Sequence, residues 1–297
     1  MRRDPALEQW ITGFLQREQL PAAYRDTISG VLLPLAEALA TRVRQSDSLV
    51  VIGLCGAQGS GKSTAAAVLC ELLGRQELPA LAVSIDDFYL PHAERQELAH
   101  RVHPLLATRG VPGTHDVELA QAVIDSLAES GETAVPVFDK ATDDRRPRPQ
   151  WRRASGPLRA VILEGWCVGA RPQTAAQLTP PLNALERDED AQGRWRGYVN
   201  AVLQGPYAPL FARLSPLVLL AAPSFEVVLQ WRTEQERKLR DRLQREGGDA
   251  SRVMSDDAIA RFISHYERIT RHILAEMPAR ADHLIDLDAS RHAQWRH

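Results

Sequence analysis

The chain has 297 residues, a formal net charge of −2, 44% hydrophobic residues and 25% charged residues. This composition is ordinary for a globular protein, and the small net charge gives no overall attraction to nucleic acid or to an acidic membrane surface. Three cysteines without metal-ligand spacing, no apolar run near 18 residues and no signal-peptide pattern together predict a cytoplasmic protein without a disulfide scaffold.

The N-terminal segment, residues 1–47, has the periodicity of amphipathic helices. Apolar residues recur three and four positions apart, at Trp10, Ile11, Phe14 and Leu15 and again at Ile28, Val31, Leu32, Leu35 and Leu39. We therefore expect a helical N-terminal extension over residues 1–47, packed beside a larger domain that spans residues 48–297.

A glycine-rich motif follows the first predicted strand. Residues 48–55, SLVVIGLC, form a short apolar run rich in β-branched residues, and residues 62–74, KSTAAAVLCELLG, have helical spacing. Between them lies GAQGSGKS, which matches the phosphate-loop pattern G-x-x-x-x-G-K-[ST]. We predict that the following residues contact a nucleotide: Gly56, Ala57, Gln58, Gly59, Ser60, Gly61, Lys62, Ser63 and Thr64.

The residue types of this motif suit polyphosphate binding. Glycines leave room for backbone N–H groups to point at phosphate oxygens, and the following helix directs its N-terminus at them. Lys62 is expected to reach the β- and γ-phosphates of ATP, and the Ser63 hydroxyl to ligate Mg²⁺. The alternative is a chance match in a turn rich in glycine and serine.

Four further apolar runs predict strands, at residues 79–86, 158–165, 216–223 and 283–288. Helical patterns alternate with them, and this alternation is typical of a parallel sheet covered on both faces. The predicted fold class is α/β, a P-loop NTPase three-layer α/β/α sandwich with a mainly parallel sheet of about five strands. Residues 143–156, DDRRPRPQWRRASG, are rich in arginine and proline and are the best candidate for a mobile loop.

Acidic residues lie at the carboxyl ends of two of the predicted strands. Ligands of open α/β sheets bind at these ends. Glu164 follows one apolar run and is a candidate metal ligand together with Ser63. Asp86 ends another run, on a strand expected beside the phosphate-loop strand, and is a candidate base that positions an attacking hydroxyl. Each carboxylate could instead cap a helix or lie at the surface.

Polar residues in three segments are candidate substrate contacts. Asp87 and Tyr89 follow Asp86 directly, and the loop TRGVPGTHD, residues 108–116, offers Arg109 as a fork for a carboxylate and His115 and Asp116 as hydrogen-bonding groups. Asp116 could instead cap the next helix. Lys140 and Arg145 lie in a polar segment and could meet an anionic acceptor, or simply be solvated charges.

A basic helix, WRTEQERKLR at residues 231–240, is a candidate lid. A lid that closes over ATP needs cations near the transferring phosphate, and Arg237 is the predicted catalytic cation. The same spacing also suits an exposed helix with salt bridges between neighbouring turns.

Absent motifs narrow the class of protein. There is neither the N/T-K-x-D signature of a guanine-binding GTPase nor the S-G-G-Q signature of a transport ATPase. A small-molecule kinase accounts for both the acceptor-side acid and the lid. A non-catalytic nucleotide-sensing module would keep Lys62 and Ser63 without needing Asp86.

Several unusual strings resemble the plant-type D-glycerate 3-kinase family, which is related to uridine kinase and phosphoribulokinase. They are SIDDFYLP, TRGVPGTHD, VILEGWCVG, WRTEQE and MSDDAIARFISHY, and with the phosphate loop they extend from about residue 48 to residue 290. The resemblance implies transfer of the ATP γ-phosphate to the 3-hydroxyl of D-glycerate, with Asp86 as base and Glu164 corresponding to the acid of the E-G motif. Other small alcohols, such as a nucleoside or pantothenate, stay open as acceptors, and no nucleic-acid or membrane partner is expected.

Overall fold

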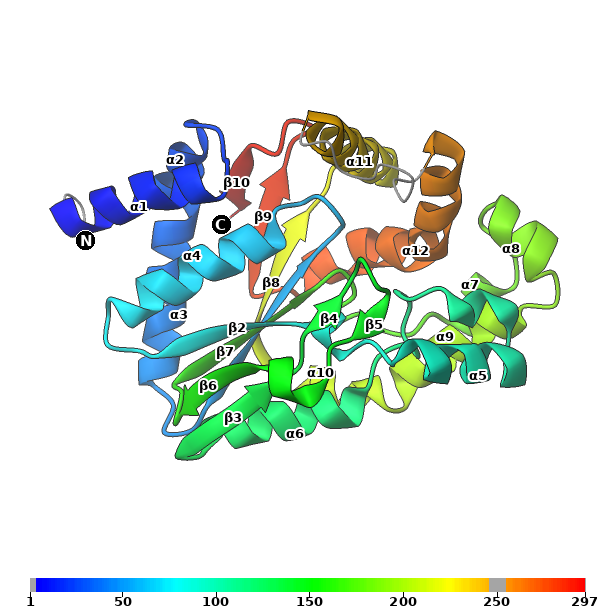
Figure 1. The fold of residues 1–297 in the computed structure, drawn as a ribbon, viewed down its shortest axis with the longest axis horizontal. Coiled ribbons are helices and arrows are strands. Elements are labelled where there is room, and N and C mark those ends of the chain that lie inside the picture. The colour runs from blue at the N-terminus through cyan, green and yellow to red at the C-terminus, as the bar shows by residue number, and fades with distance from the viewer. Residues whose placement is uncertain (1–3, 246–254, 297) are drawn as a thin grey trace.

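The computed structural model describes residues 4–245 and 255–296. Its centre is a six-stranded sheet in the order β10-β9-β8-β1-β7-β2 (Figure 1). The strands span β1 Val50–Gly56, β2 Ala80–Ser84, β7 Ala160–Gly165, β8 Leu214–Ala221, β9 His283–Leu287 and β10 Ala293–Arg296. Neighbouring strands from β9 to β2 pair in parallel, and only β10 is antiparallel. The predicted parallel sheet is confirmed, with β10 as an additional edge strand.

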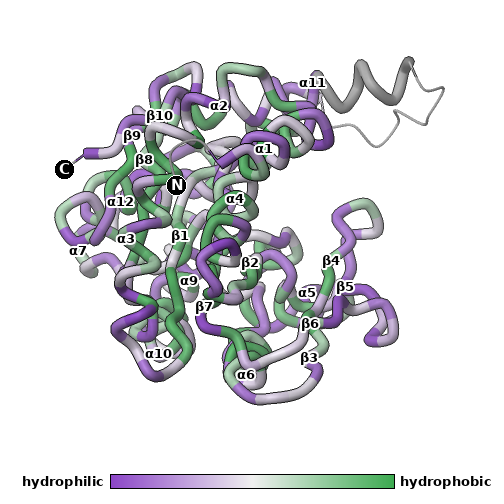
Figure 2. Tube along the Cα trace, turned by 90° about the vertical axis from the view of Figure 1, so that its left-hand side faces the viewer, coloured by the Kyte–Doolittle hydropathy of each residue, from purple (hydrophilic) through white to green (hydrophobic). Residues whose placement is uncertain are grey.

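Helices cover both faces of the sheet, and the alternation of side chains along β1 divides two hydrophobic cores. Ile52 and Leu54 point into the first core, whereas Val51 and Cys55 point into the second. Figure 2 shows the hydrophobic colour concentrated along the central strands between these layers. This arrangement is the predicted three-layer α/β/α sandwich.

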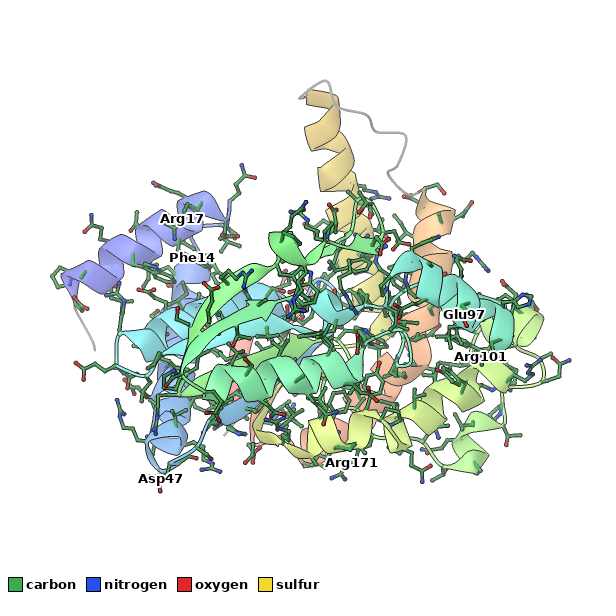
Figure 3. All side chains as sticks on the ribbon, turned by 60° about the horizontal axis from the view of Figure 1, so that its bottom comes forward. Phe14, Arg17, Asp47, Glu97, Arg101 and Arg171 are labelled. Atoms are coloured by element: carbon green, nitrogen blue, oxygen red, sulfur yellow. The ribbon has the colours of Figure 1, made fainter. Side chains whose placement is uncertain are left out.

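The first core is covered by the N-terminal helices and by the helix that follows the phosphate loop. These elements are α1 Pro5–Arg17, α2 Tyr24–Thr27, a π-helical turn at Ile28–Leu32, α3 Leu33–Arg44 and α4 Lys62–Gly74. Leu35 of α3, Leu69 of α4 and Phe14 of α1 are all buried in this cluster. Figure 3 shows Phe14 on α1, while Arg17, Asp47, Glu97, Arg101 and Arg171 lie at the surface. The helical extension therefore shares its core with the sheet.

The second core is covered by helices that follow β2 and β7. They are α5 His92–Arg101, α6 Val117–Ala128, α7 Ala175–Leu178, α8 Ala184–Glu189, α9 Arg194–Gln204 and α10 Tyr207–Ala212. Two long helices, α11 Phe225–Arg245 and α12 Asp256–Glu276, come between β8 and β9 and pack against each other. Their buried side chains include Trp231 on α11, in the first core, and Tyr266 on α12, in the second.

Two short antiparallel pairs lie outside the main sheet. Strand β3, Gly131–Val135, pairs with β6, Arg152–Gly156, and β4, Phe138–Asp139, pairs with β5, Asp144–Arg145. Both ends of residues 143–156, the predicted mobile loop, therefore take part in strand pairing. Arginine side chains outside the core do not prevent strand pairing at a sheet edge, where one strand face is solvated. The β4–β5 hairpin brings residues 139–144 towards the end of β2.

Candidate active site

The phosphate loop connects the buried strand β1 to helix α4. Gly59 has a backbone φ of 79°, and a Cβ at this position would lie only 2.8 Å from Trp231 Cβ. Its carbonyl accepts a hydrogen bond from Arg291 Nε at 2.8 Å. Gly61, with φ of 83°, precedes the first residue of α4, so the helix begins at Lys62. The loop thus holds a tight, left-handed backbone at the helix N-terminus, which is the geometry that binds phosphate.

A cleft of about 450 Å³ opens beside this loop. We call it the acceptor cleft. It is lined by Gln58, Gly59, Gly61, Lys62, Ser63, Thr64, Asp86, Tyr89, Arg109, Lys140, Trp166, Arg232, Gln235, Phe262 and Tyr266. Of the predicted nucleotide residues, Gly56, Ala57 and Ser60 are not part of this lining. Among its described lining residues the cations Lys62, Arg109, Lys140 and Arg232 outnumber the single carboxylate of Asp86, so the cleft suits anions.

Ser63 and Glu164 lie together at the ends of neighbouring elements. Strand β7 pairs directly with β1, which places Glu164 opposite Leu54 in the register. Ser63 Oγ donates a hydrogen bond to Glu164 Oε1 at 2.8 Å, and the buried Oε2 has no hydrogen-bond partner among the described residues. A hydroxyl and a carboxylate with a vacant oxygen are hard ligands of the kind that Mg²⁺ takes. The chemistry of this pair fits the predicted metal site.

Asp86 lies at the cleft on a 3₁₀ turn, Ile85–Phe88, just after β2. Lys140 Nζ contacts its Oδ2 at 2.7 Å, and the Tyr89 hydroxyl donates to Oδ1 at 2.9 Å. Burial acts to raise the pKa of Asp86, but the charges of Lys140 and Lys62 and the Lys140 hydrogen bond outweigh it and lower the pKa to about 2. The carboxylate is therefore ionised at neutral pH.

The predicted position of Asp86 needs a correction. Strand β7 lies between β1 and β2, so Asp86 follows a strand two places from the phosphate-loop strand rather than its neighbour. Because the turn after β2 curls towards the cleft, the side chain still lines it. Asp87 does not line the cleft: its Oδ1 accepts from the Phe138 backbone N at 3.2 Å, and burial raises its pKa.

Tyr89 and His115 come together because two segments of the site pair through their backbones. Leu90 N donates to Thr114 O at 2.9 Å, and the Tyr89 and His115 rings stack with centroids 4.5 Å apart. His115 is 5% exposed, bonds the Tyr207 hydroxyl through Nδ1 at 2.7 Å and does not line the cleft. Burial lowers its pKa to about 4. His115 supports Tyr89 from behind, contrary to its predicted substrate contact.

Asp116 and Arg145 are engaged in holding the backbone. Asp116 Oδ1 caps helix α6 by accepting from Leu119 N at 3.0 Å, which was the alternative reading of this residue. Arg145 donates to the carbonyls of Phe88 and Tyr89, at 3.3 and 2.9 Å, and pairs with Asp116. Neither side chain lines the cleft. Asp116 therefore caps a helix and Arg145 holds two backbone carbonyls, so both predicted substrate contacts lie away from the cleft surface.

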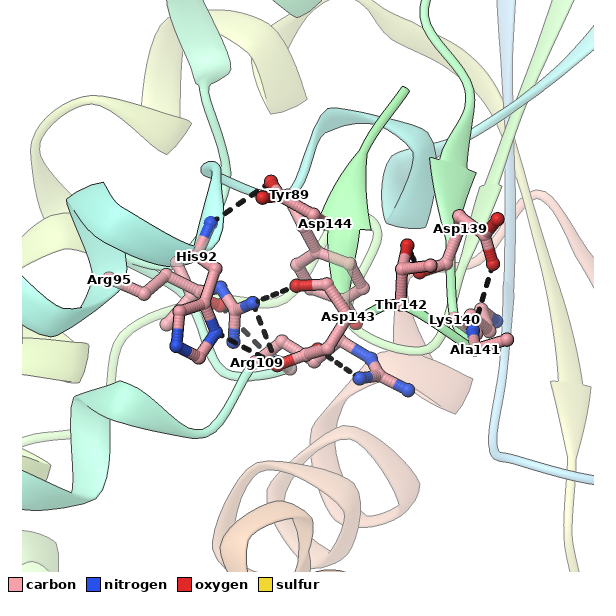
Figure 4. Close-up of polar contacts among 12 residues, drawn as sticks. Tyr89, His92, Arg95, Arg109, Asp139, Lys140, Ala141, Thr142, Asp143 and Asp144 are labelled. Carbon is pink, nitrogen blue, oxygen red and sulfur yellow. Dashed lines mark hydrogen bonds and ion pairs between the residues drawn. The ribbon is translucent and has the colours of Figure 1, made fainter. Parts of the chain in front are cut away.

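The β4–β5 hairpin delivers Lys140 to the site and is tied to the protein by Asp143 (Figure 4). Asp143 Oδ2 accepts from Arg95 Nη2 at 2.9 Å, and its other oxygen pairs with Arg109. Arg95 is fully buried, so this end of the hairpin is anchored in the protein. The Lys140 side chain, by contrast, contacts Asp86 but is 62% exposed.

Arg109 reaches the cleft from a segment that is fixed on both sides. The Tyr266 hydroxyl donates to Arg109 O at 3.1 Å, and Trp166 Nε1 donates to Gly110 O at 2.9 Å. Gly110 has φ of 137°, and a Cβ there would lie 2.1 Å from the Tyr266 hydroxyl. Tyr266 therefore packs so close to the backbone of residue 110 that only glycine fits at that position. The Arg109 guanidinium lies 5.5 Å from the Phe138 ring centroid.

Helix α11 contributes a cation to the cleft, but not the predicted one. Arg237 is exposed and pairs with Asp256 of α12 at 3.1 Å, outside the cleft lining. Arg232, five positions earlier, lines the cleft, contacts Glu236 and lies 5.9 Å from the Phe262 ring centroid. Both arginines fit the amphipathic pattern of the helix, and only packing shows that Arg232, and not Arg237, faces the cleft.

Several lining residues were not predicted as site residues. Phe262 and Tyr266, one turn apart on α12, and Gln235 on α11 reach the cleft from helices far along the chain. Trp166 also lines the cleft, beside Gly110. Phe262 and Tyr266 lie in the string MSDDAIARFISHY that carries the family resemblance, but aromatic residues at helical spacing are equally typical of a hydrophobic core.

The described residues contain neither a cluster of metal-ligating side chains nor a helix that could cross a membrane. Within residues 4–245 and 255–296, three or more histidine, cysteine, aspartate or glutamate side chains do not gather in an arrangement that could hold a metal ion. In the same ranges, every helix is too short or too polar to cross a membrane.

The sandwich fold, the phosphate loop and the carboxylates at the strand ends define a P-loop kinase. The profile of the Phosphoribulokinase / Uridine kinase family matches residues 51–171. The uncharacterized kinase mug58 of Schizosaccharomyces pombe is 35% identical over 225 residues, covering 73% of this chain and 78% of that protein. The chloroplastic D-glycerate 3-kinase of Arabidopsis thaliana is 28% identical over 265 residues, covering 82% of this chain and 53% of that protein.

A solved structure gives the same fold. The D-glycerate 3-kinase from Cryptococcus neoformans has a TM-score of 0.70 and 22% identity, and the match covers 93% of this chain and all of that one. Residues 51–171 form a phosphoribulokinase/uridine kinase family domain, and the chain belongs to the same kinase family as mug58. The chain is also homologous to D-glycerate 3-kinase. Its relatives support a small-molecule kinase.

Proposed function

We propose that the protein transfers the γ-phosphate of ATP to the 3-hydroxyl of D-glycerate, giving 3-phosphoglycerate and ADP. The observation that supports this best is one cleft that combines the phosphate-loop lysine, an ionised aspartate and several cations. An acceptor that carries both a hydroxyl and a carboxylate matches these groups, and homology to D-glycerate 3-kinase points to the same acceptor.

The nucleotide and metal would be held by residues at the N-terminus of α4. Lys62 and the loop N–H groups would bind the phosphates, and Ser63 and Glu164 would hold Mg²⁺, directly or through water. Bound Mg²⁺ would supply positive charge that offsets the negative charge of the phosphates. The Ser63–Glu164 hydrogen bond keeps the two oxygens together before any ligand binds, so little rearrangement is needed.

Asp86 would orient the acceptor hydroxyl. A bond forms between the hydroxyl oxygen and the γ-phosphorus, the bond from that phosphorus to the β,γ-bridging oxygen breaks, and ADP leaves. With a pKa lowered to about 2, Asp86 is a weak base in the free protein and acts first as a hydrogen-bond acceptor. The alcohol loses its proton late in a loose transition state, so orientation matters as much as basicity. Lys140 and Tyr89 hold the carboxylate in place.

Arg109 is the proposed partner of the acceptor's carboxylate. Arg109→Lys keeps the positive charge but loses the two-pronged donor geometry, so the KM for D-glycerate is expected to rise by about 10- to 100-fold, the usual worth of a charged hydrogen bond. The KM for ATP is expected to stay within about 2-fold. Steady-state kinetics with each substrate varied in turn measure both constants.

The control for this prediction is Arg101→Ala, an exposed arginine on α5 that does not line the cleft. It is expected to leave both constants unchanged. A normal D-glycerate KM in Arg109→Lys and Arg109→Ala would assign the carboxylate to Lys140 instead and contradict the role given to Arg109.

Arg232, rather than Arg237, is the proposed cation of the lid helix. Arg232→Ala is expected to lower kcat by about 10²-fold, the usual cost of removing one donor from a developing charge. Arg237→Ala on the same helix is the matched comparison, and its kcat is expected to stay within about 2-fold because its side chain lies outside the cleft. A larger loss in Arg237→Ala than in Arg232→Ala would reverse this assignment.

The acceptor is tested by ADP release over a panel of small alcohols. D-glycerate is expected to stimulate ADP formation from ATP and Mg²⁺ far more than L-glycerate, pantothenate, uridine or simple sugars. Strong stimulation by pantothenate or uridine, with none by D-glycerate, would support kinase activity but contradict D-glycerate as the acceptor.

A further inference from the structure

Asp143 occupies the turn between β4 and β5 in a backbone conformation that few residue types adopt easily. Its φ is 57°, in the left-handed region, which aspartate, asparagine and glycine tolerate best. Arg95 fixes this conformation, because its Nη2 donates to Asp143 O at 2.6 Å and contacts Oδ2 at 2.9 Å. Arg95 is itself fully buried and also donates to the carbonyls of Leu90 and Ala107. Asp143 is therefore held by an anchor that solvent does not reach.

The other carboxylate oxygen of Asp143 faces Arg109. Oδ1 pairs with Arg109 Nη1, so one carboxylate lies between two guanidinium groups (Figure 4). Arg109 lines the acceptor cleft, whereas Asp143 does not. Among the described residues, this contact is the one hydrogen bond that the Arg109 side chain makes. A guanidinium has several further N–H donors, and these are available to a ligand in the cleft.

The ring of Phe138 lies near both guanidinium groups. Its centroid is 5.8 Å from Arg95 Cζ and 5.5 Å from Arg109 Cζ, distances at which a cation is attracted by an aromatic ring. Phe138 is buried and begins β4, so it belongs to the same hairpin as Asp143. The hairpin therefore restrains Arg109 through a charged contact and a ring contact.

The charges of this cluster suit an anionic ligand. Burial acts to raise the pKa of Asp143, but the hydrogen bonds and charges of Arg95 and Arg109 outweigh it and lower the pKa. The carboxylate is therefore ionised at neutral pH. Two arginines share it, so one positive charge is left in excess, on the side of the cleft. An arginine that is already ordered also loses less side-chain entropy when it binds a ligand.

We propose that Asp143 is a positioning residue for acceptor binding, which aims the Arg109 guanidinium at the carboxylate of the acceptor. The inference rests on the proposed function, which gives Arg109 that carboxylate as its ligand. Asp143 does not touch the acceptor and acts through Arg109. The same hairpin carries Lys140 to Asp86. The β4–β5 hairpin therefore orients the groups for both ends of the acceptor, its carboxylate and its hydroxyl.

Asp143→Asn tests this role by removing the charge and keeping the shape of the side chain. Asparagine tolerates a positive φ as aspartate does, so the turn is expected to keep its conformation. The KM for D-glycerate is expected to rise about 10-fold, the lower end of the worth of a charged hydrogen bond, while kcat and the KM for ATP stay within about 2-fold. A displaced hairpin would also move Lys140 from Asp86 and lower kcat, so steady-state kinetics separate the two effects.

The double variant Arg109→Ala, Asp143→Asn shows whether Asp143 acts through Arg109. Once Arg109 is replaced, Asp143→Asn is expected to raise the KM for D-glycerate by less than about 2-fold further, because residues that act through one interaction are not additive. Asp144→Asn is the matched control on the same hairpin. Asp144 Oδ1 accepts from the His92 backbone N at 3.1 Å, and an asparagine oxygen can do the same, so both KM values are expected to be unchanged.

A second variant covers the case that Asp143→Asn fails to fold. Asp143→Gly also allows the positive φ but removes the whole side chain, and it is expected to raise the KM for D-glycerate at least as much. A normal KM in both variants, or the same rise with and without Arg109, would overturn the positioning role. A lower KM would overturn it too, because Asp143 would then compete with the acceptor for Arg109. A wild-type protein without D-glycerate-dependent ADP formation would instead contradict the proposed function.

Discussion

Replacement of Lys62 by alanine is expected to lower kcat/KM for phosphoryl transfer by at least about 10³-fold. Removing a single neutral donor at a developing charge already costs about 10²- to 10³-fold, and Lys62 carries a full charge into the acceptor cleft at the N-terminus of α4. The fold is expected to remain, because Lys62 belongs to the cleft lining and not to either hydrophobic core. The measurement is ADP formation at saturating acceptor, with ATP varied.

A structural control accompanies this variant. Circular dichroism and the thermal unfolding midpoint are expected to match the wild-type protein, and Lys140→Ala, which removes another cation of the same cleft, is expected to cost less. A folded Lys62→Ala protein with near-normal turnover would contradict the assignment of the phosphate loop as the nucleotide site.

Asp86→Asn is expected to lower kcat by about 10²- to 10⁴-fold, the usual range of a general-base contribution. Asparagine is nearly isosteric and can still orient a hydroxyl, but it cannot take the proton. It also loses the ion pair with Lys140, which contacts Asp86 Oδ2 at 2.7 Å. ATP affinity is expected to change little, since Lys62, Ser63 and Glu164 are untouched.

Asp87→Asn is the matched control for Asp86→Asn. Its carboxylate accepts from the Phe138 backbone outside the cleft, so its loss is expected to affect the β4 position and reduce kcat by less than about 10-fold. Each variant is measured for turnover and for nucleotide binding. A larger turnover loss in Asp87→Asn, with Asp86→Asn nearly active, would exchange the two roles, and full activity in both would remove the base from this turn.

The central strands and the phosphate loop could be predicted because their signals are local. Strands β1, β7 and β8 are buried on both faces, so each is a continuous apolar run, and Gly59 and Gly61 mark a backbone that only glycine adopts readily. Glu164 could be placed because it ends such a run. These features depend on residues that are neighbours along the chain, so they can be recognised in the sequence itself.

The rest of the site depends on packing between distant segments. Arg145 has the charge of a substrate contact, yet the carbonyls of Phe88 and Tyr89 take up its guanidinium, and nothing near it in the sequence indicates this. Arg232 and Arg237 are equally basic on one helix, and only the approach of α12 shows which faces the cleft. Strand order also depends on packing between distant segments. The sequence therefore does not show that β7 lies between β1 and β2, the strand that precedes Asp86.

The most direct test of the proposed reaction follows the phosphate itself. The protein is incubated with Mg²⁺, D-glycerate and ATP labelled in its γ-phosphate, and the product is identified by nuclear magnetic resonance and by chromatography against 2- and 3-phosphoglycerate. The label is expected in 3-phosphoglycerate, with one ADP formed for each phosphate transferred and no product from Lys62→Ala. Label released as inorganic phosphate, or carried on the 2-hydroxyl or on no glycerate at all, would contradict the proposal.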